Sequence, residues 1–156
     1  MAFLLLGGLL AGCAAQLAPA YSPALVQGLQ TLNQQAMQLF AQTAGGVPQA
    51  TFQKREETYT ALIGQATALA NLARARPDPA GLPKFVESKL KDWTKVQTFA
   101  APTGDILTKI ANDFSMMRQS DQQAGLSLEE ARLFQNGFSI DVQQALMYEN
   151  ALNRDQ

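Results

Sequence analysis

Cysteine has the most distinctive chemistry of the residue types in this sequence, and the chain contains one cysteine, Cys13. It stands at the end of an apolar run of about ten residues, directly after Ala11 and Gly12. Such a run is too short to cross a bilayer core of roughly 30 Å, and small residues before the cysteine suit a signal peptidase. Residues 1–12 are therefore expected to be an export signal, although no basic residue precedes Lys54. The alternative is a short buried apolar segment with an ordinary buried thiol.

The segment Leu10-Ala11-Gly12-Cys13 resembles the lipobox of bacterial lipoproteins. The resemblance implies that Cys13 becomes the first mature residue, carries palmitate-type acyl chains and anchors the protein in the cell envelope. Ala14, where an aspartate could stand, resembles the signal for delivery to the outer membrane, facing the periplasm. Residues 13–21 then form a lipidated tether that reaches at most about 30 Å when extended.

The other residues that could do chemistry form no catalytic pattern. Histidine is absent, so the chain offers neither an imidazole ligand nor a histidine base for a serine nucleophile. Two pairs of neighbouring glutamates fall near expected helix starts, where the helix dipole explains acidic residues. Methionine sulfurs could bind Cu(I), but methionine more often fills a core. We therefore expect a protein that is not an enzyme and that has no metal site and no cofactor. The glutamates are Glu56, Glu57, Glu129 and Glu130, and the methionines are Met37, Met116, Met117 and Met147.

Charge and composition exclude several classes of partner. The formal net charge is -1 and 16% of residues are charged, so there is no basic footprint for nucleic acid. Arg74, Arg76 and Arg118 are expected to be solvated or placed by the helix dipole. After Cys13 no apolar run approaches the roughly 20 residues that cross a membrane. A single cysteine also excludes an intramolecular disulfide framework. Residues 22–156 fit one domain stabilised by packing.

Apolar residues recur at spacings of three and four and predict helices. The first helix has Ser22 as its N-cap and Pro23 at its first position, and it runs to Gly45-Gly46. The second starts near Val47-Pro48, with Thr51 as an alternative cap, and stops at Pro77.

The second half of the chain predicts one shorter helix and two long ones. The shorter helix covers residues 83–99, and the next periodic segment ends at Gly125, a suitable left-handed cap. Ser127 and Glu130 then form a capping-box pattern at the start of the last helix, which runs from Leu128 to about Asn153. No strand is predicted.

These elements predict an all-α fold: an antiparallel up-down four-helix bundle with an additional shorter helix. The reason is that short connections make sequential helices antiparallel neighbours. Gly28, Gly64 and Gly137 lie inside the predicted helices. They mark either close approaches between helices or tolerated positions.

Three segments carry a further resemblance. They are residues 21–32, the Tyr59 helix ending in Arg74-Ala75-Arg76-Pro77, and residues 144–152 of the last helix. Together they are similar to an uncharacterised family of small helical lipoproteins of Gram-negative bacteria. The resemblance implies the helical fold and the envelope location, and it assigns no functional residue beyond Cys13.

Two surfaces are candidate contacts. The first helix has an uncharged face of Gln27, Gln30, Asn33, Gln34, Gln38 and Gln42, within a stretch without charge that extends from Met1 to Gln53. This face is either simply solvated or meets a partner or a membrane surface, where charge would cost desolvation.

The other surface is the segment from Lys84 to Lys95, which combines the lone tryptophan with four lysines. It suits a membrane interface; alternatively, Trp93 docks on the bundle and the lysines are solvated, with Glu87 and Lys91 pairing. The possible membrane or partner contacts are Lys84, Lys89, Lys91, Trp93 and Lys95.

The sequence therefore predicts a lipid-anchored, non-enzymatic helical bundle. We expect it to act as a scaffold or accessory subunit for an envelope protein partner, with contact to the membrane through lipidated Cys13. The alternative is a protein that binds an apolar small molecule or lipid between its helices, which requires a sizeable apolar cavity. No small-molecule substrate is identified.

Overall fold

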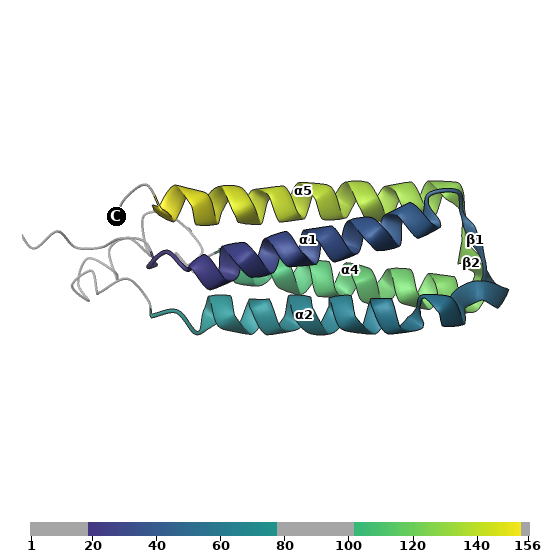
Figure 1. Ribbon diagram of the computed structural model, residues 1–156, viewed down its shortest axis with the longest axis horizontal. Coiled ribbons are helices and arrows are strands. Elements are labelled where there is room, and N and C mark those ends of the chain that lie inside the picture. Colours follow the sequence, from purple (N-terminus) through teal and green to yellow (C-terminus); the bar gives the residue numbers. More distant parts are fainter. Residues whose placement is uncertain (1–18, 78–101, 154–156) are drawn as a thin grey trace, which may run out of the picture.

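The computed structural model describes residues 19–77 and 102–153. In chain order the elements are α1 (Pro23–Thr43), β1 (Val47–Pro48), the 3-10 helix η1 (Gln49–Lys54), α2 (Glu56–Arg74), α4 (Pro102–Ala124), β2 (Gly125–Leu126) and α5 (Leu128–Leu152). The long helices run up and down beside one another (Figure 1). The expected all-α helical bundle is thus confirmed for the described residues, whereas the additional shorter helix expected at residues 83–99 lies outside them.

Local sequence explains where α1 and α5 begin. The Ser22 side chain accepts a hydrogen bond from the backbone N–H of Leu25 at 3.4 Å, and a proline occupies the first turn of α1. At α5, Ser127 Oγ accepts from the backbone N–H of Glu130, and the Glu130 carboxylate accepts from the backbone N–H of Ser127. This reciprocal capping box, predicted from the sequence, satisfies donors that the first turn of a helix leaves unpaired.

The four long helices surround one apolar core. α1 packs between α2 and α5, and α4 lies between the same two helices on the other side (Figure 1). The apolar residues of α1 that recur at spacings of three and four are all buried: Leu25, Leu29, Leu32, Ala36, Leu39 and Phe40. Within this core the rings of Phe40, Phe114 and Phe138 pack together with centroids 5.4 to 6.1 Å apart. Burial of these side chains is the main favourable contribution to folding.

The connection between α1 and α2 differs from the expectation of a turn followed directly by helix. Val47 and Pro48 pair antiparallel with Leu126 and Gly125, and η1 follows before α2 begins at Glu56. Gly46 and Gly125 each have φ near +79°, a conformation that glycine adopts without strain. A Cβ on Gly125 would lie 2.2 Å from the Val47 carbonyl oxygen, so glycine is also required sterically. This two-residue ribbon is too short to leave a strand pattern in the sequence.

The three helix-interior glycines have different surroundings. A Cβ at Gly28 would lie 2.3 Å from a methyl carbon of Leu69, so α1 and α2 approach closely there. Gly64 and Gly137 have nothing within 4 Å of the equivalent position. The expected close approach therefore holds for Gly28 alone among the three.

No helix within the described residues combines the length and the apolar character needed to cross a membrane.

Candidate functional site

The sequence-predicted site residues lie outside the part of the chain that the structure describes. These residues are Cys13, Lys84, Lys89, Lys91, Trp93 and Lys95. Their roles therefore stay predictions. The candidate sites that the structure does show are the surfaces and polar clusters of the bundle itself.

One buried polar cluster lies at the ribbon end of the bundle. Arg55, between η1 and α2, donates from Nε and Nη2 to the two carboxylate oxygens of Asp121 on α4, each at 2.8 Å. Tyr59 donates its hydroxyl proton to Asp121 Oδ2 at 3.0 Å, and Arg55 Nη1 donates to Thr51 Oγ1. Arg55 is 4% exposed, and Asp121 and Tyr59 are fully buried. The two-point geometry is the strongest form of arginine–carboxylate pair.

Burial and hydrogen bonding within this cluster raise the pKa values of Arg55 and Tyr59. The hydrogen bonds to Asp121 raise the pKa of Arg55 above its ordinary value. Burial, with the adjacent Asp121 charge as a second cause, raises the pKa of Tyr59 above 10.0. Both groups therefore keep their protons at neutral pH, and the cluster is an ion pair with a neutral phenol.

A second cluster lies at the opposite end. Arg76 donates from Nη1 and Nη2 to the Glu149 carboxylate on α5 at 2.8 and 2.9 Å, and Thr103 of α4 donates to the same carboxylate. Glu149 is fully buried, and the Arg76 side chain is 9% exposed. Arg76 was expected to be solvated or placed by the helix dipole, and that expectation is wrong because Glu149 offers a buried partner 73 residues away. The cluster joins the ends of α2 and α5 to the start of α4.

A third pair links α4 to α5 at the surface. Lys109 Nζ donates to Asp141 at 2.6 Å and to Asp113, four residues along α4, at 2.9 Å. The hydrogen bond to Asp141, followed by that to Asp113, raises the pKa of Lys109. The Lys109 side chain is 57% exposed, so this pair contributes little stability.

These clusters suit structure better than catalysis. Each of the three carboxylates, on Asp121, Asp141 and Glu149, already pairs with a cation. Within residues 19–77 and 102–153 no three acidic or cysteine side chains come close enough to hold a metal ion. Met117 is buried, whereas Met116 and Met147 are 52% and 73% exposed, so these sulfurs do not converge in the core.

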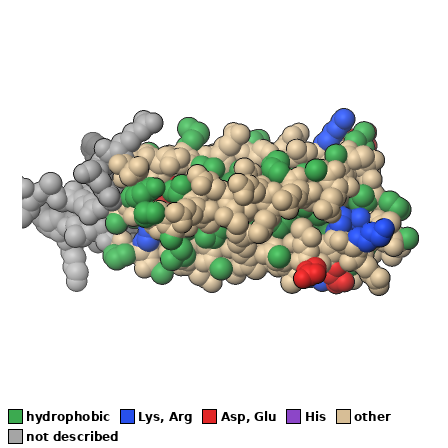
Figure 2. All heavy atoms as spheres, in the orientation of Figure 1, with side chains coloured by type: hydrophobic (Ala, Val, Ile, Leu, Met, Phe, Trp, Pro, Cys, Tyr) green, Lys and Arg blue, Asp and Glu red, His purple; other side chains and the backbone are tan. Residues whose placement is uncertain are grey.

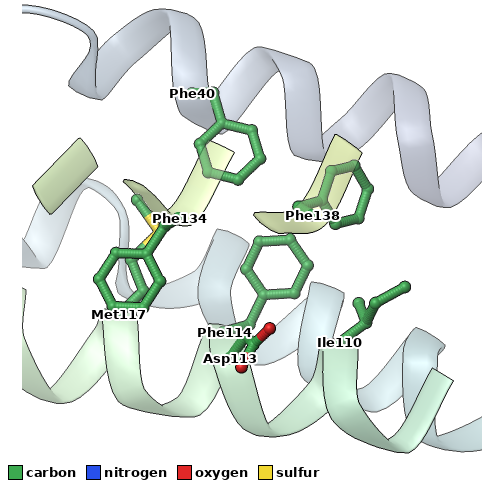
Figure 3. Close-up of a pocket in the computed structure, with 7 residues that line it drawn as sticks. All are labelled: Phe40, Ile110, Asp113, Phe114, Met117, Phe134 and Phe138. Atoms are coloured by element: carbon green, nitrogen blue, oxygen red, sulfur yellow. The ribbon is translucent and has the colours of Figure 1, made fainter. Parts of the chain in front are cut away.

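A small, partly open apolar pocket lies between α1, α4 and α5 (Figure 3). Its volume is about 10 Å³, close to the minimum that a single water molecule occupies. This pocket therefore gives no support to the alternative of an apolar ligand held between helices. Its lining residues are Phe40, Ile110, Asp113, Phe114, Met117, Phe134 and Phe138.

The most distinctive surface is an uncharged one. We define the neutral face as the exposed side chains of α1 together with those of α2 between residues 58 and 73; neither stretch contains a charged residue. Within the described ranges, the exposed charges lie on α4, at Arg74, at Lys54 of η1 and in the first turns of α2 and α5. Figure 2 views the bundle from the α1 side, and the central part of the surface carries no charged side chain.

The sequence indicated part of this surface. The uncharged glutamine face of α1 was predicted, and Gln27, Gln30, Gln34, Gln38 and Gln42 are exposed, whereas Asn33 is half-buried. The continuation across α2 was not predicted, because it depends on which residues of α2 the bundle leaves exposed.

Comparisons of the chain with protein-family models, with curated proteins and with solved structures found no significant match.

Proposed function

We propose that the protein is a lipid-anchored, non-enzymatic scaffold or accessory subunit that binds an envelope protein partner through the neutral face. The observation that carries the proposal is the absence of charge along the whole of α1 and the adjacent part of α2. Charged residues are depleted at the centres of protein interfaces, because an imperfectly paired charge is costly to desolvate. Glutamine, asparagine and threonine side chains can instead exchange hydrogen bonds with a partner.

Packing in the bundle supports a preformed face. α1 is fixed by buried leucines along its inner side, and the close approach at Gly28 fixes α1 against α2. The two buried ion-pair clusters hold the ends of the bundle. A rigid face is ordered before it binds, which lowers the entropic cost of association.

The positions of the helix ends indicate which end of the bundle would face the membrane. The start of α1, the end of α2, the start of α4 and the end of α5 all lie at the same end of the bundle (Figure 1). Arg76 Nη1 also donates to the carbonyl oxygen of Ala20 at 3.4 Å. If Cys13 is acylated, this end faces the membrane and the neutral face extends along the side of the bundle. Pro77 and Pro102, which flank the lysine- and tryptophan-containing segment, lie at this end too, in keeping with a role for Lys84, Lys89, Lys91, Trp93 and Lys95 near the membrane.

Affinity purification from detergent-solubilised envelopes tests the partner. The intact protein should recover one protein in a fixed ratio. Gln27→Lys with Gln34→Lys places two charges seven residues apart on the neutral face and should abolish that recovery. Asn112→Lys with Gln119→Lys, with the same spacing on exposed positions of α4, is the matched control and should leave recovery unchanged. Equal recovery with both pairs would exclude the neutral face as the binding surface.

Replacement of Cys13 tests the anchor. Cys13→Ser should release the protein from membranes and abolish labelling by a fatty-acid probe. Retained labelling would contradict acylation at this residue, without bearing on the neutral face.

A further inference from the structure

The dipeptide Asn136-Gly137 lies in the middle of α5, and it is the one place in the chain where glycine follows asparagine. The Asn136 side chain is exposed. A Cβ added at Gly137 would have nothing within 4 Å, in contrast to Gly28, which lies against Leu69. Among the described residues no packing contact therefore requires glycine at this position.

An asparagine followed by glycine undergoes a covalent reaction that needs no enzyme. The backbone nitrogen of Gly137 loses its proton and attacks the side-chain carbonyl carbon of Asn136. The new C–N bond closes a five-membered succinimide ring, and the side-chain amide takes up a proton and leaves as ammonia. Water then opens the ring at either of its two carbonyl carbons and gives aspartate or isoaspartate. Glycine favours the attack because it has no side chain to hinder it and adopts a wide range of backbone angles.

The helical backbone of α5 opposes this reaction in two ways. In an α-helix the N–H of residue 137 donates to the carbonyl oxygen of residue 133, so the nitrogen that must lose its proton is held as a donor. A planar ring also requires the nitrogen of Gly137 to eclipse the Cβ of Asn136, and a helical ψ of about −42° keeps the two far from eclipsed. Both obstacles disappear when this part of α5 unfolds.

We propose that Asn136 is a covalent modification site, protected by the folded α5 and deamidated through Gly137 whenever this part of the helix opens. The rate in the native protein is then the rate in the unfolded chain multiplied by the fraction of time that α5 is open. The site converts unfolding of α5 into a permanent chemical change. This proposal does not rest on the proposed function.

The aspartate product leaves the fold intact. It keeps the main chain unchanged and adds one negative charge at an exposed position. Arg132, four residues earlier on α5, is exposed as well and carries the opposite charge, which favours the new carboxylate. A chain with aspartate at position 136 should therefore refold.

The isoaspartate product changes the backbone itself. Its main chain runs through the former side chain, which inserts one methylene between residues 136 and 137, so the residues that follow lose their helical register with those before. Phe138 comes directly after this point, and its ring packs against Phe40 and Phe114 in the core (Figure 3). Val142, one turn further along, is buried too. A chain with isoaspartate at position 136 cannot rebuild α5 against the core, so this product makes unfolding irreversible.

Peptide mass spectrometry tests the protection. The full chain with Cys13→Ser is held at mildly alkaline pH, either in buffer or in guanidinium chloride that unfolds it. Asn136 should deamidate at least about tenfold more slowly in buffer, which corresponds to about 1.4 kcal/mol for opening α5. In denaturant it should react much faster than Asn150, which is also exposed on α5 but precedes Ala151. Equal rates at Asn136 in the two solutions, or equal rates at Asn136 and Asn150 in denaturant, would overturn the proposal.

Refolding after the incubation in denaturant separates the two products. Isoaspartate, labelled by an isoaspartyl methyltransferase, should be concentrated in the chains that fail to refold. Asn136→Asp is the matched control, because it carries the charge without the altered backbone, and it should refold with the helix content of the parent. Gly137→Ala should stay refoldable after the same incubation, since the alanine side chain hinders the attack. Isoaspartate at position 136 in fully refolded chains, or an Asn136→Asp chain that does not refold, would show that the altered backbone is not what blocks α5.

Discussion

The cluster of Arg55, Tyr59 and Asp121 makes the sharpest prediction about stability. Asp121→Asn removes the negative charge and leaves the Arg55 guanidinium, 4% exposed, opposite a neutral amide. Arg55 makes two hydrogen bonds at 2.8 Å to the Asp121 carboxylate, and the Tyr59 hydroxyl donates to one of the same oxygens, so the substitution weakens the acceptor of all three bonds. Removing one partner of a buried ion pair costs about 3–5 kcal/mol, because the remaining charge stays buried without compensation. Against a typical total of about 5–15 kcal/mol, that loss is a large fraction of the free energy of unfolding.

Removing the whole cluster should cost much less than removing one partner. In the chain with Arg55→Met, Tyr59→Phe and Asp121→Leu, no buried charge remains in this cluster. Replacing a buried ion pair by apolar residues of similar volume is often neutral or stabilising. The triple variant should therefore lie within about 2 kcal/mol of the parent and be more stable than Asp121→Asn.

Urea unfolding followed by circular dichroism measures these differences through the midpoint and the slope. Asp105→Asn is the matched control, because Asp105 pairs with Arg74 at 3.0 Å but the side chains are 79% and 49% exposed. The control should cost less than about 1 kcal/mol. If Asp121→Asn costs no more than Asp105→Asn, the uncompensated-charge argument is refuted.

Three further predictions concern pH, capping and the glycines. Because the fold raises the pKa of Tyr59, the contribution of this group to stability is complete below its ordinary pKa of 10.0 and is lost as the pH rises through the folded value. Tyr59→Phe lacks this group, so it should lose a smaller part of its own neutral-pH stability in alkali than the parent does. Hydrogen bonds from the Ser127 backbone, then from its side chain, lower the pKa of Glu130, so this contribution is present above 4.5 and lost as pH falls through the folded value. Ser127→Ala should cost about 1 kcal/mol at pH 7. It removes the side-chain hydrogen bond to Glu130 and keeps the backbone one, so the pH dependence of the urea midpoint below pH 4.5 should become shallower without disappearing. Gly64→Ala should raise the free energy of unfolding by up to about 1 kcal/mol. Gly28→Ala should raise it less, or lower it, because the added Cβ would meet Leu69. An equal increase in both variants would contradict the close approach of α1 and α2 at Gly28.

The sequence predicted the parts of the fold that depend on local patterns. The Ser22 cap, the Ser127 and Glu130 capping box and the left-handed Gly125 are all present, because each is decided by a few consecutive residues. The buried leucines of α1 follow from a single periodicity in the same way. The ribbon of β1 and β2 was missed because two residues per strand cannot show an alternating pattern.

The buried charges could not be predicted because they depend on the relative positions of different helices. Arg55 and Asp121 are 66 residues apart, and Arg76 and Glu149 are 73 apart. Periodicity does indicate which face of its own helix a residue occupies, and Asp121 continues the buried series of Phe114 and Met117 on α4. The presence of a carboxylate at a core position is the signal that could have identified a buried partner for Arg55.

The same limit applies to the proposed binding surface. The sequence predicted the uncharged side of α1 from one helix alone. Its extension over α2 required knowledge of which side of α2, including Thr60, Gly64 and Thr67, stays exposed in the bundle.

Site-specific photo-cross-linking in intact cells tests the central claim most directly. A photoreactive residue at Gln34, on the outer side of α1, should give one discrete cross-linked product with an envelope protein, while the same residue at Asn112 on α4 should give none. Cross-linking at Asn112 with no product at Gln34 would contradict the assignment of the neutral face as the surface that binds the partner.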